Sequence, residues 1–271
     1  MQLDITASIV LYKSDPEIVR AAIDSFLKYT LRSKLFLLDN SPTDALRVLA
    51  NDARIEYVFS HGNIGFGKAH NIAIKKSEAI SKYHLVLNPD VYFDGGVLEE
   101  LFGFMEQHTD VGQIMPLILF PDGQIQYSGK LLPSPLDLVG RRILPGWRYF
   151  RKRNDLYELR NSGYNKVMNV PQHLGCFLLI RTTVFKTVGY FDEKMFMYME
   201  DIDITRRIHQ KFQTLFYPNV HIYHHYEQGS KQSSKLLKFH INSTITYFNK
   251  WGWLFDKEGK SVNKRAIEVY N

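Results

Sequence analysis

Strand-like and helix-like segments alternate along the first hundred residues. Apolar, β-branched runs predict buried parallel strands over residues 5–11, 34–38, 55–59 and 83–87. Asp15, Pro16 and Glu17 have the order of an N-cap, a first-turn proline and an acidic first turn, and apolar residues follow at helical spacing. Further helices are predicted over residues 44–51, 67–80 and 97–106. This βαβαβαβ order predicts an α/β fold with an open, mostly parallel central sheet flanked by helices on both faces.

The second half of the chain has a less regular pattern. Two strands, 111–120 and 124–127, are predicted around the turn Pro121-Asp122-Gly123. Ordered strand segments are then expected over residues 167–170, 176–181, 214–217 and 221–223, and helices over 183–188, from Asp201 onward and over 235–251. Residues 134–165 are rich in Pro, Gly and Arg, which predicts a partly mobile excursion.

Polar residues follow the predicted strands at the points where these end. Open parallel sheets bind ligands at the carboxyl ends of their strands, so such residues are expected to share one site. Tyr12 and Asp15 follow the first strand, Asp39 the second, Asn63 the third and Asp90 the fourth. That these polar residues all fall at one edge of the predicted sheet is a stronger indication of a ligand-binding site than any single motif.

The composition is that of a soluble globular protein. The chain has 271 residues, 45% of them hydrophobic and 23% charged, which suits one large core. The N-terminal residues lack a signal-peptide pattern and no stretch reaches bilayer-spanning length, so a cytoplasmic location is expected. The single cysteine, Cys176, lies in an apolar run and predicts a buried thiol in a reducing compartment.

The net charge of +6 is unevenly distributed. Residues 141–153 contain Arg141, Arg142, Arg148, Arg151, Lys152 and Arg153 without an acidic residue, interleaved with Trp147, Tyr149 and Phe150. Basic residues mixed with aromatic ones suit an anionic membrane surface or a phosphate-bearing substrate, and a solvated basic loop is the alternative. No nucleic-acid-binding motif accompanies them, so no nucleic-acid partner is expected.

Two of the strand ends carry acidic side chains. In Asn88-Pro89-Asp90 the proline closes the strand, so Asp90 is placed at the sheet edge. Magnesium or manganese on a nucleotide diphosphate takes only one or two protein carboxylates, which makes Asp90 a candidate ligand and Asn88 a neutral partner. Asp39 can accept hydrogen bonds from a base or a ribose. The alternatives are a plain strand-terminating turn at Asp90 and a turn cap at Asp39.

The loop of residues 61–71 is glycine-rich and precedes a predicted helix. Gly65 and Gly67 permit close backbone approach and positive φ, and exposed N–H groups before a helix favour phosphate or other polar ligands. The loop follows the third strand and lacks a final glycine, so it does not match a dinucleotide fingerprint. A simple turn with a helix cap is the alternative.

Three carboxylates, Glu200, Asp201 and Asp203, are crowded at the start of a predicted helix. Its apolar, methionine-rich approach suggests a pocket wall, where burial and like charge raise a carboxyl pKa and suit a general base. Ordinary helix N-terminal carboxylates are the alternative. His224 and His225 end a later strand, where an imidazole can complete a Mn²⁺ site or be structural.

Taken in order, these segments resemble family 2 glycosyltransferases of the GT-A fold, in the rhamnosyltransferase-like branch of bacterial surface-polysaccharide synthesis. The resemblance covers residues 3–251. The segments that carry it are 8–12, 38–41, 63–71, 88–91, 175–181, 188–193 and, most strongly, Phe196-Met197-Tyr198-Met199-Glu200-Asp201-Ile202-Asp203 with the arginines that follow.

The resemblance implies an inverting transfer from a nucleotide-diphosphate sugar to a hydroxyl group. Asp201 matches the family's base, and Asp90 matches the last aspartate of its DxD motif, with Asn88 at the position of the first. Asp90 and His224 would bind Mg²⁺ or Mn²⁺, while Glu200 and Asp203 are expected to contact the acceptor. The expected nucleotide-binding residues are Tyr12, Asp15, Asp39, Asn63, Gly65, Gly67, Asn71 and Asn88.

The same resemblance implies a domain organisation and partners. A catalytic domain is expected over residues 1–230, with a nucleotide-binding half (1–110) and an acceptor-binding half (111–230), followed by a C-terminal helical extension over 231–271. The expected acceptor is an oligosaccharide on a polyprenyl-diphosphate carrier, and dTDP-rhamnose is the first choice of donor, followed by a UDP-hexose. A nucleotidyltransferase and a non-catalytic carbohydrate-binding protein are the alternatives. A nucleotidyltransferase usually has a basic, glycine-rich loop after the first strand. Here that loop is Tyr12-Lys13-Ser14-Asp15, which contains one lysine and no glycine.

Overall fold

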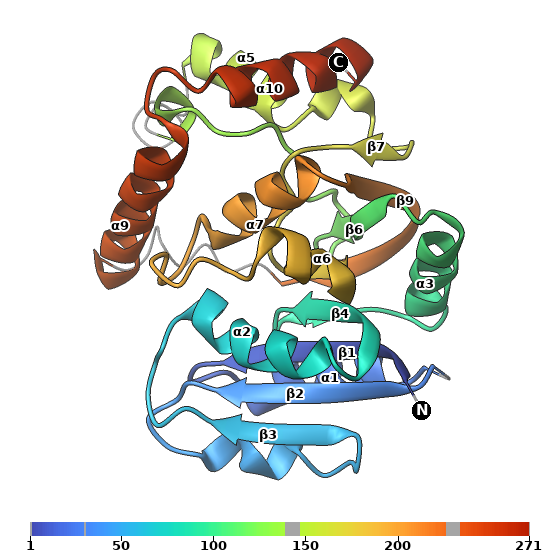
Figure 1. The fold of residues 1–271 in the computed structure, drawn as a ribbon. Helices are drawn as coiled ribbons and strands as arrows, with labels where there is room; N and C mark the ends of the chain where they lie inside the picture. Colours follow the sequence, from blue (N-terminus) through green and yellow to red (C-terminus); the bar gives the residue numbers. More distant parts are fainter. Residues whose placement is uncertain (1, 30, 139–146, 226–233, 271) are drawn as a thin grey trace.

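A nine-stranded sheet lies at the centre of the computed structural model, which describes residues 2–29, 31–138, 147–225 and 234–270 (Figure 1). Four strands of the first half are mutually parallel, in the order β3-β2-β1-β4. Their bounds are β1 (Leu3–Leu11), β2 (Ser33–Asp39), β3 (Ile55–Phe59) and β4 (Ser81–Leu87). The four strands predicted from the apolar runs are therefore confirmed.

Helices cover both faces of this parallel part. Ile23 and Phe26 of α1 belong to the same buried cluster as Ala7 and Ile9 of β1 on one face. On the other face, Ala73 of α2 packs in a cluster with alternate residues of β2. The bounds are α1 (Pro16–Leu27), the 3-10 helix η1 (Ala45–Leu49), α2 (Phe66–Ser77) and α3 (Val97–Gln107). The side chain of Asp15 accepts a hydrogen bond from the Glu17 N–H, so the predicted helix cap is confirmed.

The second half of the sheet is mixed. The strand β8 (Phe177–Arg181) runs antiparallel between β4 and β6 (Val111–Leu119), and β9 (Gln213–His224) runs parallel to β6. The short strands β5 (Val91–Tyr92) and β7 (Met168–Asn169) pair antiparallel with β9. A strand that is buried on both faces is a continuous apolar run whether it lies parallel or antiparallel to its neighbours. The sequence pattern therefore did not indicate which strands are antiparallel.

Three predictions for the second half are corrected. Residues 124–127 form no strand, because only an isolated bridge joins Ile125 to Leu119. The two strands predicted over 214–217 and 221–223 are one strand, β9, which continues past an irregular register opposite Pro116 and Leu117. The expected mobile excursion contains the helix α5 (Arg148–Tyr157) and the 3-10 helix η2 (Arg160–Ser162), while residues 139–146, with Arg141 and Arg142, lie outside the described residues.

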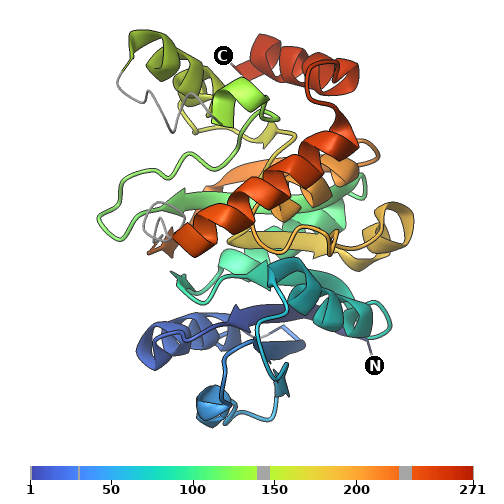
Figure 2. The ribbon, with the colours of Figure 1, turned by 90° about the vertical axis from the view of Figure 1, so that its left-hand side faces the viewer.

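Four further helices complete the described part of the second half. Two lie near the sheet, α6 (Thr182–Val188) and α7 (Glu200–His209), and two follow at the C-terminal end, α9 (Ser234–Trp251) and α10 (Lys257–Tyr270). Figure 2 shows α9 running across one side of the molecule and α10 lying at the top with α5. The sequence predicted a C-terminal helical extension over residues 231–271, but it gave bounds only for the first of the two helices found there, α9. Its Asn263 side chain exchanges two hydrogen bonds with the backbone of Leu132, which fixes this helix to the rest of the protein.

None of the described helices is long and apolar enough to cross a bilayer. The division at residues 110 and 230 stays a prediction.

Candidate active site

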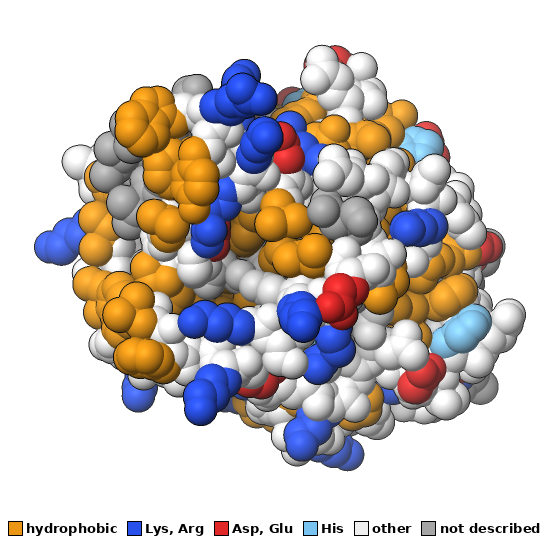
Figure 3. All heavy atoms as spheres, turned by 90° about the horizontal axis from the view of Figure 1, so that it is seen from above, with side chains coloured by type: hydrophobic (Ala, Val, Ile, Leu, Met, Phe, Trp, Pro, Cys, Tyr) orange, Lys and Arg blue, Asp and Glu red, His pale blue; other side chains and the backbone are white. Residues whose placement is uncertain are grey.

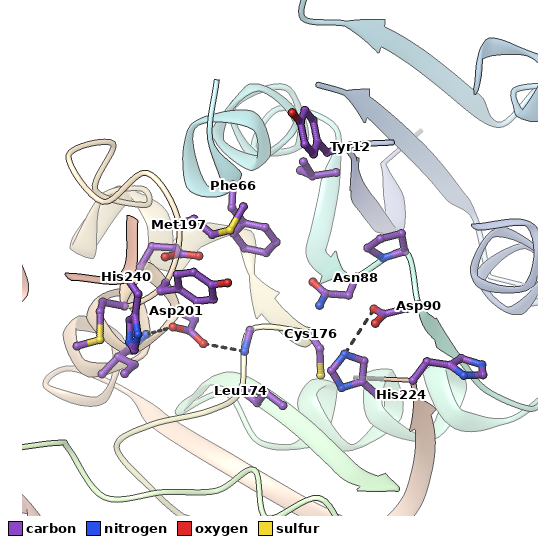
Figure 4. Close-up of a pocket in the computed structure, with 18 of the residues that line it drawn as sticks. Tyr12, Phe66, Asn88, Asp90, Leu174, Cys176, Met197, Asp201, His224 and His240 are labelled. Carbon is purple, nitrogen blue, oxygen red and sulfur yellow. Dashed lines mark hydrogen bonds and ion pairs between the residues drawn. The ribbon is translucent and has the colours of Figure 1, made fainter. Parts of the chain in front are cut away.

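A cleft of about 750 Å³ lies at the carboxyl ends of β1 and β4 (Figure 4). Both halves of the chain contribute to its walls: the loop after β1, the end of β4, the segment before β8, the start of α7 and one residue of α9. Among the residues predicted from the sequence, those that line the cleft are Tyr12, Asp15, Asn63, Asn88, Asp90, Glu200, Asp201 and His224. Those that do not are Asp39, Gly65, Gly67, Asn71 and Asp203.

Asp39 is fully buried behind the cleft wall. One carboxylate oxygen accepts a hydrogen bond from the Ser41 N–H at 2.8 Å, and the other accepts the Tyr57 hydroxyl at 2.5 Å. Ser41 in turn accepts a hydrogen bond from the backbone N–H of Lys13, a residue that lines the cleft. Asp39 therefore caps the turn and shapes the loop that borders the cleft, while its contact with a nucleotide stays a prediction.

The glycines of the loop before α2 are explained by packing. Gly65 has φ of 95°, and a Cβ there would lie 2.7 Å from the Phe196 carbonyl oxygen. A Cβ on Gly67 would lie 2.8 Å from the Cβ of Phe191. The buried Asn71 side chain donates to the Phe191 carbonyl and accepts from its N–H. These three residues pack or bond the segment before α7 against α2. They therefore position the residues that line the cleft without lining it themselves.

Asp203 also lies away from the cleft. It is fully buried and accepts hydrogen bonds from Trp251 Nε1 at 2.8 Å and from Arg207 Nε at 2.9 Å. The ammonium group of Lys250 approaches the same carboxylate at 2.8 Å. The geometry fixes the end of α9 to α7 and gives Asp203 no open path to an acceptor in the cleft.

Asp90 and His224 face each other on one side of the cleft (Figure 4). His224 Nε2 lies 3.4 Å from Asp90 Oδ1, and that buried oxygen has no hydrogen-bond partner within the described residues. Burial lowers the pKa of His224, but nearby Cys176 and the Asp90 carboxylate outweigh this effect and raise it to about 10. A carboxylate oxygen and an imidazole nitrogen aimed at one point suit Mn²⁺ or Mg²⁺.

Gln126 holds His224 in this orientation, and sequence reasoning missed it. Its Nε2 donates to the His224 carbonyl at 2.6 Å, which leaves its Oε1 to accept from His224 Nδ1 at 3.0 Å. The raised pKa means that Nε2 also carries a proton, shared with Asp90, when no metal is bound. A metal ion between the two side chains would displace that proton while Nδ1 keeps its own. No three or more His, Cys, Asp or Glu side chains in the described ranges are placed to hold a metal ion together, so diphosphate oxygens and water would complete the coordination.

Glu200 and Asp201 lie on the other side of the cleft, at the start of α7. Asp201 Oδ2 accepts a hydrogen bond from the Gly175 N–H at 3.0 Å, and Oδ1 accepts from its neighbour Ile202 at 2.9 Å. A Cβ on Gly175 would lie 2.9 Å from Asp201 Cβ, so this glycine leaves room for the carboxylate. Burial raises the pKa of Asp201, while those backbone hydrogen bonds oppose the rise.

The Glu200 side chain differs from its neighbour. It is buried, and its Oε2 has no hydrogen-bond partner in the part of the chain that the structure describes. Burial and then the Asp201 charge raise the Glu200 pKa well above its ordinary value. The pair therefore offers one carboxylate that can take a proton and one carboxyl that tends to keep its own.

The cleft has the parts of a transferase that uses an activated, diphosphate-bearing donor: a carboxylate–imidazole pair suited to a metal, opposite a carboxylate suited to proton removal. The chain belongs to glycosyl transferase family 2, whose model matches residues 6–186. It is a glycosyltransferase, as the sequence predicted, and this class replaces the nucleotidyltransferase and non-catalytic alternatives.

Two curated relatives support the rhamnosyltransferase-like branch. The chain is 26% identical over 257 residues to the N-acetylglucosaminyl-diphospho-decaprenol L-rhamnosyltransferase of Mycobacterium tuberculosis, covering 87% of this chain and 81% of that protein. It is 28% identical over 225 residues to the rhamnosyltransferase WbbL of Escherichia coli, covering 79% of this chain and 81% of that one.

Solved structures confirm the predicted GT-A fold. GalNAc-T7 with UDP, GalNAc and Mn²⁺ matches with a TM-score of 0.66 at 15% identity, over 96% of this chain and 51% of that one. The mannosyltransferase PcManGT of Pyrobaculum calidifontis with GDP-Man and Mn²⁺ matches with a TM-score of 0.58 at 12% identity, over 99% and 75%. This chain thus spans about half of the GalNAc-T7 structure.

Proposed function

We propose that this glycosyltransferase moves a sugar, with inversion, from a nucleotide-diphosphate donor to a hydroxyl group of a lipid-linked glycan acceptor. The first choice of donor is dTDP-rhamnose, and the first choice of acceptor is an oligosaccharide on a polyprenyl diphosphate. The product would enter a surface polysaccharide such as O-antigen, capsule or cell wall, made at the cytoplasmic face of the membrane.

One observation carries the proposal: Asp201 and the Asp90–His224 pair line opposite sides of the same cleft. In an inverting transfer, the base removes the acceptor proton on one face of the sugar while the diphosphate departs from the other. Asp201 would take the hydroxyl proton, the acceptor oxygen would bond to the anomeric carbon, and the bond to the diphosphate would break. General-base assistance of this kind contributes roughly 10²–10⁴-fold.

The other residues of the cleft would bind and orient. Asn88, Tyr12 and Asn63 also line the cleft and would contact the nucleotide and diphosphate. Glu200, with its raised pKa, would donate its proton in a hydrogen bond to an acceptor hydroxyl. A Mg²⁺ or Mn²⁺ ion held by Asp90 and His224 would supply positive charge for the diphosphate as it leaves.

The choice of donor rests on two relatives that are rhamnosyltransferases, and on a polyprenyl-linked acceptor in the name of one of them. A UDP-hexose is the second candidate, since UDP and a hexose derivative accompany Mn²⁺ in a structure of the same fold.

The test is release of nucleoside diphosphate from dTDP-rhamnose, UDP-hexoses and GDP-mannose, with and without Mn²⁺ and a short-chain polyprenyl-diphosphate glycan. We expect acceptor-dependent release from dTDP-rhamnose and an inverted anomeric configuration of the product by NMR. Turnover only with a UDP-hexose would replace the donor, and retention of configuration would overturn the mechanism.

A further inference from the structure

The turn between α9 and α10 presents an apolar tip to solvent. Trp253, Leu254 and Phe255 are 44%, 69% and 85% exposed, and Phe255 is more exposed than any other large hydrophobic side chain within the described residues. Three consecutive exposed side chains of this size are unusual on a soluble surface, where contiguous apolar patches generally mark a binding site.

Tight contacts hold this tip in place. Gly252, with φ of 100°, donates its N–H to the Phe248 carbonyl at 2.8 Å, and Trp253 Nε1 donates to Asn249 Oδ1 at 2.8 Å. On the other side, Asp256 accepts a hydrogen bond from the Gly259 N–H at 2.7 Å and two from the buried guanidinium of Arg206. The apolar side chains are therefore exposed by a fixed backbone.

The charge around the tip is positive. Lys257, Lys260, Lys264 and Arg265 are exposed on α10. Three acidic side chains lie among them: Asp256 and Glu258, which both pair with Arg206, and Glu268, which pairs with Lys264. With Arg206 counted, five cationic and three acidic side chains leave a net charge of +2. The ammonium group of Lys260 also donates to the Leu254 carbonyl at 2.9 Å, which places a cation directly at the tip.

A second group of the same kind lies on α5, with Trp147 64% exposed and Tyr149 57% exposed. Its neighbours Arg148, Arg151 and Lys152 are also exposed. Figure 1 places α5, α10 and the turn before α10 at one end of the molecule. Figure 3 looks down on that end and shows separate groups of apolar side chains with Lys and Arg side chains between them.

We propose that this face docks onto a membrane whose lipids carry anionic headgroups, with Leu254 and Phe255 inserted below the headgroups. Aromatic and aliphatic side chains enter the headgroup–acyl boundary, and surrounding Lys and Arg side chains bind the negative surface. The backbone of the tip is held rigidly, which favours such insertion. The exposed aromatic side chains at α5 would provide a second contact and so set the tilt of the protein relative to the membrane.

The proposal deepens the proposed function, because it locates the cleft relative to the membrane. His240, which lines the cleft, and Trp251, next to the tip, lie on the same helix α9. Eleven residues of helix span about 16 Å, so this end of the cleft would lie no more than about that distance above the docked tip. A glycan attached to a lipid carrier in the same membrane would therefore be within reach of the cleft.

The test is flotation of the full chain with phosphatidylglycerol-containing vesicles and with pure phosphatidylcholine vesicles. We expect binding to the anionic vesicles and at least about tenfold weaker partition for Leu254→Ser/Phe255→Ser, since two buried side chains are lost. The control is Val48→Ser, which removes a side chain that is 72% exposed on η1. Circular dichroism and thermal denaturation confirm that each variant folds.

Absence of wild-type binding to anionic vesicles would overturn the proposal, as would equal loss for the tip variant and Val48→Ser. If the tip variant instead changes a dimer into a monomer by size-exclusion chromatography without altering flotation, a second copy of the chain covers the tip. Flotation requires no turnover, so failure here is distinguishable from failure of the proposed transfer reaction.

Discussion

Glu200 and Asp201 are adjacent at the start of α7 and line the same cleft, yet their surroundings differ. Asp201 accepts two backbone N–H groups, which favour its carboxylate form, whereas Glu200 Oε2 has no hydrogen-bond partner in the described chain. The raised pKa of Glu200 therefore favours a proton on that side chain, and Asp201 is the group of the pair that ionises first.

This difference predicts opposite outcomes for two isosteric changes. Asp201→Asn removes the base and is expected to lower kcat by about 10²–10⁴-fold with little change in nucleotide affinity. Glu200→Gln keeps a donor of the same shape as the protonated acid, so we expect a loss of less than about tenfold. Steady-state kinetics with the donor and acceptor identified above measures both. Equal losses in the two variants would contradict the assignment of roles.

The role of Gln126 could not be recognised from the sequence. Gln126 is a single glutamine after a turn, and no motif surrounds it. It orients His224 through a side-chain contact, and His224 is 98 residues distant in the chain. The bond to the backbone carbonyl orients the Gln126 amide, and the bond to Nδ1 holds the imidazole ring with a proton on that nitrogen, which is a common function of residues behind a metal ligand.

We predict that Gln126→Leu weakens Mn²⁺ binding by about 10–100-fold, because the imidazole then loses its fixed orientation. Titration calorimetry or electron paramagnetic resonance with Mn²⁺ and a nucleoside diphosphate measures the affinity without turnover. Gln124→Leu is the matched control, since that glutamine lies on the same turn with an exposed side chain. Unchanged Mn²⁺ affinity in Gln126→Leu would show that Gln126 does not position His224.

At the scale of elements, local signals predicted the first half of the fold well. The Asp15 cap, the alternating strand and helix periods and the short loops all depend on neighbouring residues, and the parallel order follows from the connections. The position of β8, antiparallel between β4 and β6, depends instead on how the chain runs between β6 and β8, and no local signal in the sequence indicates this. A helical extension was expected over residues 231–271, but the bounds of α10 within it were not predicted. Its sequence has few strongly apolar residues at helical spacing, and Val262 and Ala266 are among the few residues that it buries.

The contact between α7 and α9 is a second element-scale feature. Asp203 on α7 binds Lys250 and Trp251 at the end of α9, and the same helix carries His240 to the cleft. From the sequence, an acidic residue near the start of a helix is interpreted as an N-terminal carboxylate or as a site residue. Nothing in the sequence indicates that Lys250 and Trp251 contact Asp203.

We predict that Asp203→Asn destabilises the protein by about 1–3 kcal/mol, because Arg207 and Lys250 lose the buried carboxylate that accepts their hydrogen bonds. Urea denaturation measures the free energy of unfolding, and Asp24→Asn, at an exposed position on α1, is the control. If Asp203 bound the acceptor instead, the acceptor KM would rise while the free energy of unfolding stayed the same. That outcome would restore the role predicted from the sequence.

At the scale of the whole molecule, the chain brings together residues that are far apart in sequence. The expectation that polar residues at the strand ends share a cleft holds for Tyr12, Asp15, Asn63 and Asp90 but not for Asp39. Strand order determines where a residue lies, and this much can be predicted from the sequence. Whether a carboxylate faces the cleft or is used by its own loop depends on contacts such as that between Tyr57 and Asp39.

The core also contains three buried imidazoles that the proposed reaction does not use. His84 lies in a hydrogen-bonded chain with Ser8, Thr6 and Ser77 between β1, β4 and α2. His70 joins this chain through Ser8, and His173 contacts Gln113 elsewhere in the sheet. Burial lowers the pKa of His84 and of His173 to about 3, and that of His70 well below its ordinary value.

These histidines predict a loss of stability in mild acid. In the unfolded chain they take up protons near pH 6.5, whereas in the folded protein they stay neutral to a much lower pH. Their stabilising contribution is therefore complete above about pH 6.5 and is lost as the pH falls towards the folded pKa, by about 1.4 kcal/mol per pH unit for each histidine. The raised pKa of Glu200 opposes this trend, so the informative measurement is a comparison between variants.

We expect His84→Gln to flatten the dependence of the unfolding free energy on pH between about 6 and 4.5, by roughly 1.4 kcal/mol per pH unit relative to the wild type. Urea denaturation at several pH values gives this slope separately from the constant loss that the substitution causes at neutral pH. His221→Gln, on an exposed position of β9, removes an imidazole that the core does not enclose and should leave the slope as it was. Parallel curves for the wild type and His84→Gln would mean that His84 is protonated to the same extent in the folded and unfolded states, and burial in the sheet would then have no part in the acid sensitivity of this protein.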